Sequence, residues 1–92
     1  MKKQGKNIFE EIGFSRSESL SLMRKAELFD EVRSRISGLE MTQAKIAKLL
    51  GISQPRVSDI TKGKISAFSI EMLLEFLDKL GGSVSWKFKK VI

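Results

Sequence analysis

TQAKIAKLLGISQPRVSDITK, residues 42–62 of the chain, predicts two short helices joined by a tight turn. Thr42 and Ser53 are of the types that cap helix N-termini, because their side-chain oxygens accept hydrogen bonds from free backbone N–H groups. Gly51 stands between the two segments, where the turn requires a positive φ. Pro55 falls in the first turn of the second helix, where its missing N–H does no harm.

The apolar residues of this stretch fit the interior of two crossing helices. Helices that meet at about 90–120° leave little volume between them. Ala47 is small where the helices must approach closely, and Val57 is the β-branched residue expected to pack beneath the turn. Larger aliphatic side chains fill the remaining interior positions, namely Ile46, Leu50, Ile52 and Ile60.

Capping residues and apolar stripes predict further helices on both sides of this unit. Ser15 and Glu18 form a capping box at the start of a helix of about 20 residues, whose apolar stripe runs from Leu20 to Ile36. A short helical turn is expected before Ser15. Ser69 caps another helix on the C-terminal side, with leucines along its inward stripe.

Residues 83–92 change from helical to alternating periodicity. Val84, Trp86 and Phe88 alternate with serine and lysine, the pattern of a half-buried strand. Because one strand cannot satisfy its own backbone N–H and C=O groups, we expect it to pair with the same strand of a second copy across a twofold axis. The alternative is a coil that lies across the helices.

The predicted fold is an all-α domain of five helices with a C-terminal β-strand that pairs across a dimer. Residues 1–7 are polar and basic and are expected to form a flexible arm. Residues 8–82 hold the helix-turn-helix domain, with its motif at 42–62, and residues 83–92 form the dimerisation strand. No linker indicates a second domain.

The composition excludes several classes of function. The 92 residues include no cysteine and no histidine, which excludes disulfides, zinc fingers, cysteine nucleophiles and histidine acid–base catalysis. Carboxylates that are adjacent in the sequence, as at Glu10–Glu11, diverge on a helix and make poor acid–base pairs, which disfavours a small nuclease. No apolar run approaches the ~20 residues needed to span a bilayer, and no signal-peptide pattern opens the chain. We expect a cytoplasmic, non-enzymatic protein with no cofactor, metal or membrane partner.

Positive charge is concentrated around the two short helices. The formal net charge of the whole chain is +6. Residues 42–65 contain five lysines and arginines against one aspartate, a net of +4 (5 − 1). A phosphate-facing surface requires such a concentration, although a solvated basic face without a partner would show it too.

Residues 42–62 resemble the helix-turn-helix of the phage repressor and Cro family, whose bacterial relatives are called xenobiotic-response-element-type (XRE) regulators. FEEIGF at 9–14, ISQPRVSDITKGKISAFSIEMLLEFLDKLG at 52–81 and SVSWKFK at 83–89 resemble its small antitoxin subgroup. The resemblance covers about residues 8 to 90, although unpaired regulators share the same architecture. It implies an autorepressor that binds a palindromic operator in double-stranded DNA, with a cognate toxin protein as a further partner. The region through Phe14, or the long first helix, is the candidate toxin-binding surface.

The helical wheel predicts which residues of the second short helix face DNA. Val57 and Ile60 are expected to face the interior, so the opposite side is free for contact. The residues on that side are Pro55, Ser58, Asp59 and Lys62. Gln54 and Arg56 flank them at the helix N-terminus, the end that enters the major groove in this motif.

These side chains offer different chemistry to base edges. Gln54 can pair with N6 and N7 of adenine, and Arg56 with O6 and N7 of guanine or with a phosphate. Ser58 can donate or accept, whereas Pro55 offers only apolar contact, for instance with a thymine methyl group. Asp59 either accepts from N4 of cytosine or serves a local structural role.

The remaining predicted DNA contacts are to phosphate. Lys62 and Lys64 follow the second helix and fit contacts that fix register without reading sequence. The resemblance implies that Gln43 contacts a phosphate, and Ser53 completes the predicted set. The alternative function is a protein-interaction module that keeps the helical scaffold and binds no specific DNA.

Overall fold

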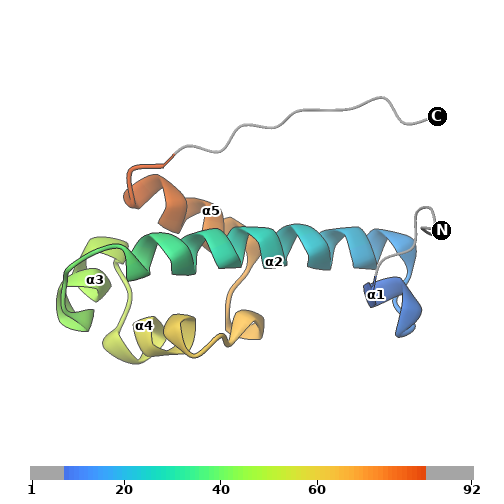
Figure 1. Cartoon of the computed structure of the whole chain (residues 1–92), viewed down its shortest axis with the longest axis horizontal. Helices are drawn as coiled ribbons and strands as arrows, with labels where there is room; N and C mark the ends of the chain where they lie inside the picture. The colour runs from blue at the N-terminus through green and yellow to red at the C-terminus, as the bar shows by residue number, and fades with distance from the viewer. Residues whose placement is uncertain (1–7, 83–92) are drawn as a thin grey trace.

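The computed structural model describes residues 8–82 (Figure 1). Within that range it contains five α-helices, one short 3-10 helix and no strand. The elements are α1 (Ile8–Glu11), α2 (Arg16–Ser37), α3 (Gln43–Leu50), α4 (Gln54–Thr61), η1 (Ile65–Ala67) and α5 (Ile70–Lys79). The prediction of five helices is therefore confirmed. The predicted arm at 1–7 and the predicted strand at 83–92, with Val84, Trp86 and Phe88, lie outside the described residues.

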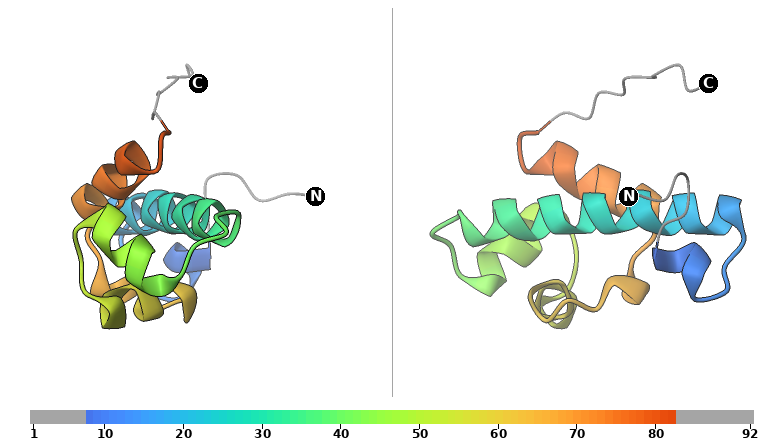
Figure 2. Two further views of the ribbon diagram at one scale, coloured as in Figure 1. Left: turned by 90° about the vertical axis from the view of Figure 1, so that its left-hand side faces the viewer. Right: turned by 45° about the vertical axis from the view of Figure 1, so that its right-hand side comes forward.

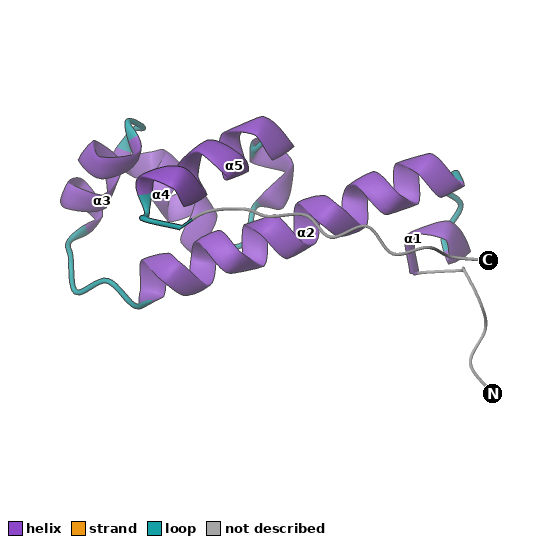
Figure 3. Cartoon of the chain, turned by 90° about the horizontal axis from the view of Figure 1, so that it is seen from above, coloured by secondary structure: helices purple, strands orange, loops and turns teal. Residues whose placement is uncertain are grey.

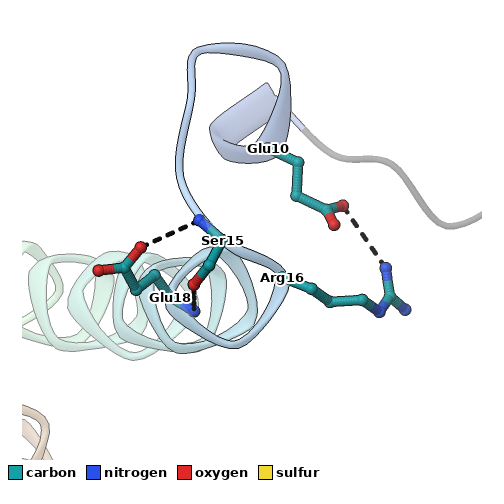
Figure 4. Close-up of polar contacts among 4 residues, drawn as sticks. All are labelled: Glu10, Ser15, Arg16 and Glu18. Carbon is teal, nitrogen blue, oxygen red and sulfur yellow. Dashed lines mark hydrogen bonds and ion pairs between the residues drawn. The ribbon is translucent and has the colours of Figure 1, made fainter.

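The capping box predicted at the start of α2 is present (Figure 4). The Ser15 Oγ accepts from the Glu18 N–H at 3.2 Å, and the Ser15 N–H donates to Glu18 Oε1 at 3.0 Å. The Ser15 backbone N–H and, second to it, the Ser15 hydroxyl group lower the pKa of the Glu18 carboxyl group, so this contribution is present at neutral pH and is lost as the pH falls through that lowered pKa. An ion pair between Glu10 Oε1 and Arg16 Nη1 at 3.5 Å joins α1 to α2.

The long helix α2 forms the axis of the described domain. The α3–α4 unit packs on one side of it and α5 on the other, as the end-on view in Figure 2 shows. Seen from above, α3, α4 and α5 gather toward one end of α2, and α1 folds back on the opposite end (Figure 3). The helix-turn-helix unit is therefore held against both α2 and α5.

The hydrophobic core lies where α2, α3, α4 and α5 meet. Its buried members are Leu28, Phe29, Val32, Ile36, Ile46, Ala47, Leu50, Val57, Ile60, Phe68, Leu73, Phe76 and Leu77. Three phenylalanine rings contact one another in series within the core. The ring centroids are 6.0 Å apart for Phe29 and Phe68 and 5.9 Å apart for Phe68 and Phe76. The predicted interior of the helix-turn-helix is confirmed, and Ile52 packs at its edge, partly buried.

The first half of α2 extends beyond this core. Its apolar stripe begins at Leu20 as predicted, but Leu20 is exposed and the first core member on α2 is Leu28. Ile8, Ile12 and Phe14, which lie in α1 and the loop after it, are exposed as well. Helical periodicity identifies an apolar face but does not say how far the neighbouring helices extend along it.

The 3-10 helix η1 follows α4 and was not predicted. Residues 65–67 form a single turn, and one turn is too short to leave a periodic apolar signal. Among residues 8–82, no helix combines the length and apolar character needed to cross a bilayer.

Candidate DNA-binding interface

A side-chain cap fixes the start of each of the two short helices. The Thr42 Oγ1 accepts from the Lys45 N–H at 3.2 Å, which starts α3. The Ser53 Oγ accepts from the Arg56 N–H at 3.4 Å, which starts α4, and Pro55 lies in its first turn. Both caps and the position of the proline are as the sequence predicts. Because the Ser53 hydroxyl accepts in its cap, its own proton remains available for an acceptor outside the protein.

The turn between α3 and α4 depends on Gly51. Its φ is 74°, in the left-handed region that favours glycine, as predicted. The N–H groups of Gly51 and Ile52 both donate to the Ala47 carbonyl, at 2.8 and 3.0 Å. From α5, the Lys79 Nζ donates to the Leu50 carbonyl at 3.1 Å. The carbonyl of the last residue of α3 is thereby bonded to α5. This bond holds the turn from outside the helix-turn-helix motif.

The side chains of α4 differ in their burial. Val57 and Ile60 are fully buried, whereas Gln54 and Pro55 at the start of the helix are exposed. Ser58 is partly buried near the middle of the helix. No hydrogen bond joins the Gln54 side chain to any other residue within 8–82, so its amide can pair with an external group.

Asp59 has a partner inside the protein. Its Oδ1 lies 3.8 Å from the Lys64 Nζ, and its backbone carbonyl accepts from the Lys64 N–H at 2.9 Å. These contacts fold the segment after α4 back on the helix. Of the two roles that the sequence left open for Asp59, this geometry favours the local structural one.

The Arg56 side chain contacts other parts of the protein. Its Nη2 donates to the Ala67 carbonyl at 3.1 Å and lies 3.8 Å from the Met72 sulfur. Its guanidinium carbon is 4.8 Å from the centroid of the Phe68 ring, which is buried in the core. The guanidinium is thus directed at η1 and the start of α5, while Gln54 and Pro55 remain in solvent.

Comparison with known proteins identifies the family. A family model described as a helix-turn-helix domain matches residues 8–89. A solved structure described as a candidate XRE family transcriptional regulator has a TM-score of 0.72 and 30% sequence identity, over 80% of this chain and 83% of that chain. No curated protein matches the sequence significantly. The chain belongs to the Cro-like helix-turn-helix regulators.

This helix-turn-helix regulator has exposed basic side chains on the elements before and after α4. Lys45 and Lys48 are exposed on α3, and Lys62 and Lys64 are exposed on the segment that follows α4. Gln43, the first residue of α3, is exposed too. As a Cro-like regulator the protein is a DNA-binding transcriptional regulator, and these exposed cations lie on the segments that precede and follow α4.

The regulator contains one further α4 contact that sequence patterns did not indicate. Arg33 on α2 donates from Nη2 to the Thr61 carbonyl at the end of α4, at 3.0 Å. Its guanidinium carbon is also 5.9 Å from the centroid of the Phe29 ring. An exposed arginine on a long helix carries no local signal, because its partner is 28 residues away in the sequence.

Proposed function

We propose that the protein is a dimeric autorepressor of the antitoxin type that binds a palindromic operator through α4. The observation that carries this proposal is the exposed start of α4, where Gln54 and Pro55 face solvent, together with exposed lysines on the segments before and after the helix. A dimer of this motif places two such helices ~34 Å apart, which matches successive major grooves on one face of the duplex.

Base reading is assigned to the exposed side of α4. Gln54 is proposed to pair with N6 and N7 of adenine, and Pro55 to touch a thymine methyl group. Ser58 provides a further donor or acceptor close to the groove. Asp59 remains in the DNA-facing set but is proposed to act mainly through its pairing with Lys64.

Phosphate contacts are assigned to residues that surround α4. Gln43 and Ser53 lie at the starts of α3 and α4, where free N–H groups and helix dipoles attract anions. Lys62 and Lys64 are exposed after α4. An exposed ion pair such as Lys64 with Asp59 contributes little by itself, so the ammonium can exchange its partner for a phosphate.

The experiment that tests this function is a fluorescence-anisotropy titration of the full chain. The probe is duplex DNA from immediately upstream of its own gene, with a scrambled duplex as competitor, at two salt concentrations. Preferential binding that weakens as salt rises supports an operator-binding regulator. Equal, weak binding to both duplexes contradicts autorepression and favours a protein-interaction module.

Dimerisation is assigned to residues 83–92 on the strength of their alternating pattern. Val84, Trp86 and Phe88 would form the apolar face of a strand paired across the twofold axis. Trp86→Asp is expected to yield monomers in analytical ultracentrifugation, because it places a charge in that interface. A matched Lys87→Asp variant, on the polar side of the pattern, should remain dimeric. A dimer that persists in Trp86→Asp would place the interface elsewhere.

Partner-protein binding is assigned to the apolar surface of α1 and the start of α2. Ile8 and Ile12 are 67% and 66% exposed, and Phe14 and Leu20, which follow in the chain, are exposed as well. Several large apolar side chains exposed on one segment of the chain are characteristic of protein–protein interfaces. The proposed occupant is the cognate toxin that the antitoxin resemblance implies, and the surface lies at the end of α2 opposite the DNA-binding unit (Figure 3).

Ile12→Ala is expected to weaken binding of that toxin about tenfold, since a buried isoleucine side chain contributes roughly 1.5 kcal/mol or more at an interface. The measurement is isothermal titration calorimetry with the purified protein encoded by the gene adjacent to that of the regulator. Met41→Ala is the matched control, because Met41 is an exposed apolar residue on the loop before α3. Equal affinities for the two variants would exclude this surface.

A further inference from the structure

Helix α4 is attached to the domain at both ends by an arginine. At its C-terminal end, Arg33 of α2 donates to the Thr61 carbonyl at 3.0 Å. At its N-terminal end, Arg56 donates to the Ala67 carbonyl of η1 at 3.1 Å. The two contacts join α4 to different neighbours, α2 at one end and η1 at the other.

The contact at the C-terminal end satisfies a need of the helix itself. The last carbonyls of a helix lack partners within it and carry its negative partial charge. The last turn of α4 contains no basic residue of its own. Arg33 supplies the missing positive charge from α2, and its position over the Phe29 ring connects it to the core.

At the N-terminal end, the positive charge of Arg56 interacts unfavourably with the helix dipole. A cation in the first turn of a helix is disfavoured, because that end carries positive partial charge. Arg56 lies in that turn, and α4 has no acidic residue there to offset it. The Ala67 carbonyl and the face of the buried Phe68 ring provide the compensating negative partners.

We propose that Arg56 and Arg33 are positioning residues that set the orientation of α4 on the domain, and that Arg56 contacts neither a base nor a phosphate in the bound complex. The inference rests on the proposed function, since orientation matters here for DNA reading. It removes Arg56 from the base-reading set and leaves Gln54 as the principal reader at the start of α4.

A positioning role has a different signature from a contact. Removal of a base contact relaxes discrimination at one base pair, and removal of a phosphate contact lowers the salt slope by about one unit. A helix that tilts misplaces all of its side chains together. Variants of Arg56 or Arg33 should therefore lose discrimination at several adjacent base pairs while the salt slope remains unchanged.

The test begins with a duplex that the wild-type full chain selects from a random-sequence pool. Arg56→Lys, Arg56→Gln and Arg33→Gln are then titrated against this duplex and a series carrying one changed base pair each, at several salt concentrations. We expect each variant to lose about tenfold in preference for the selected duplex over a scrambled one. Arg56→Lys should not rescue it, because an ammonium lacks the planar guanidinium that covers Phe68.

Two controls calibrate these readouts. Arg24→Gln removes an exposed arginine from α2 that pairs only with Glu27 among the described residues, and it should behave as wild type. Lys62→Ala removes a proposed phosphate contact and should weaken all sequences alike, with a salt slope shallower by about one unit. Far-UV circular dichroism verifies that each variant is folded.

Amide hydrogen exchange of the free protein separates this inference from the proposed function. Relative to wild type, Arg56→Gln should accelerate amide exchange in α4 more than in α3. This expectation does not depend on whether the protein binds DNA. Loss of discrimination at a single base pair, a reduced salt slope in Arg56→Gln, or unchanged exchange in α4 would each overturn the positioning role. Failure of the wild type to select any duplex would instead overturn the proposed function.

Discussion

Phe76→Ala is expected to lower the free energy of unfolding by about 3–5 kcal/mol. The Phe76 side chain is 2% exposed and projects from α5 into the core, where its ring meets the edge of Phe68. Truncation removes apolar contact area and leaves a cavity between α5 and its neighbours. Since small domains are stable by roughly 5–15 kcal/mol, the variant would lose a large part of its stability.

Urea unfolding followed by circular dichroism measures this effect. Leu20→Ala is the matched control, because Leu20 is an apolar side chain on the exposed first half of α2. We expect the control to lose about 1 kcal/mol or less, as is usual for exposed positions. Equal losses in the two variants would mean that the core does not centre on the phenylalanine cluster. Binding assays should be performed well below the denaturation midpoint, so that a loss of folded protein is not mistaken for a loss of DNA contact.

Gln54→Ala is expected to weaken binding to the preferred duplex by about 1–3 kcal/mol, or roughly 5- to 150-fold. The Gln54 side chain is exposed at the start of α4, and its amide can form two hydrogen bonds to one adenine. Loss of this contact should relax discrimination at a single base pair, in contrast to the variants of Arg56. Because the side chain is exposed, the unfolding free energy should change by less than about 0.5 kcal/mol.

Anisotropy titrations against duplexes with single base-pair changes measure this prediction. Ser21→Ala, on the exposed surface of α2 and away from α4, is the matched control and should leave every affinity unchanged. If Gln54→Ala reduced the affinity for all duplexes equally, the residue would be a backbone contact. An unchanged affinity for the preferred duplex would remove Gln54 from the interface.

The helix boundaries could be predicted because they depend on neighbours in the sequence. Thr42 and Ser53 cap the helices that directly follow them, and Gly51 adopts the positive φ that its turn requires. The burial of Val57 and Ile60 follows in the same way from helical periodicity within α4. Local rules thus predicted the helix-turn-helix, and with it the residues exposed at the start of α4.

The contacts that hold α4 depend instead on distant segments. Arg56 meets a carbonyl of η1, a turn too short to predict, and Arg33 meets a carbonyl 28 residues away. On a helical wheel Arg56 is simply the polar neighbour of Gln54, so its direction toward Phe68 could not be anticipated. The exposure of Leu20 has the same kind of cause, because it depends on where the helices packed against α2 stop.

The separation between holding α4 and reading DNA has an evolutionary consequence. Capping by Ser53 and anchoring by Arg33 and Arg56 do not involve the side chain at position 54. A new residue there would alter which operator the proposed regulator prefers at almost no cost in stability. Duplicated copies of the gene could therefore acquire separate target sites through single substitutions. Each copy would keep the same scaffold and would regulate genes that the other copy does not.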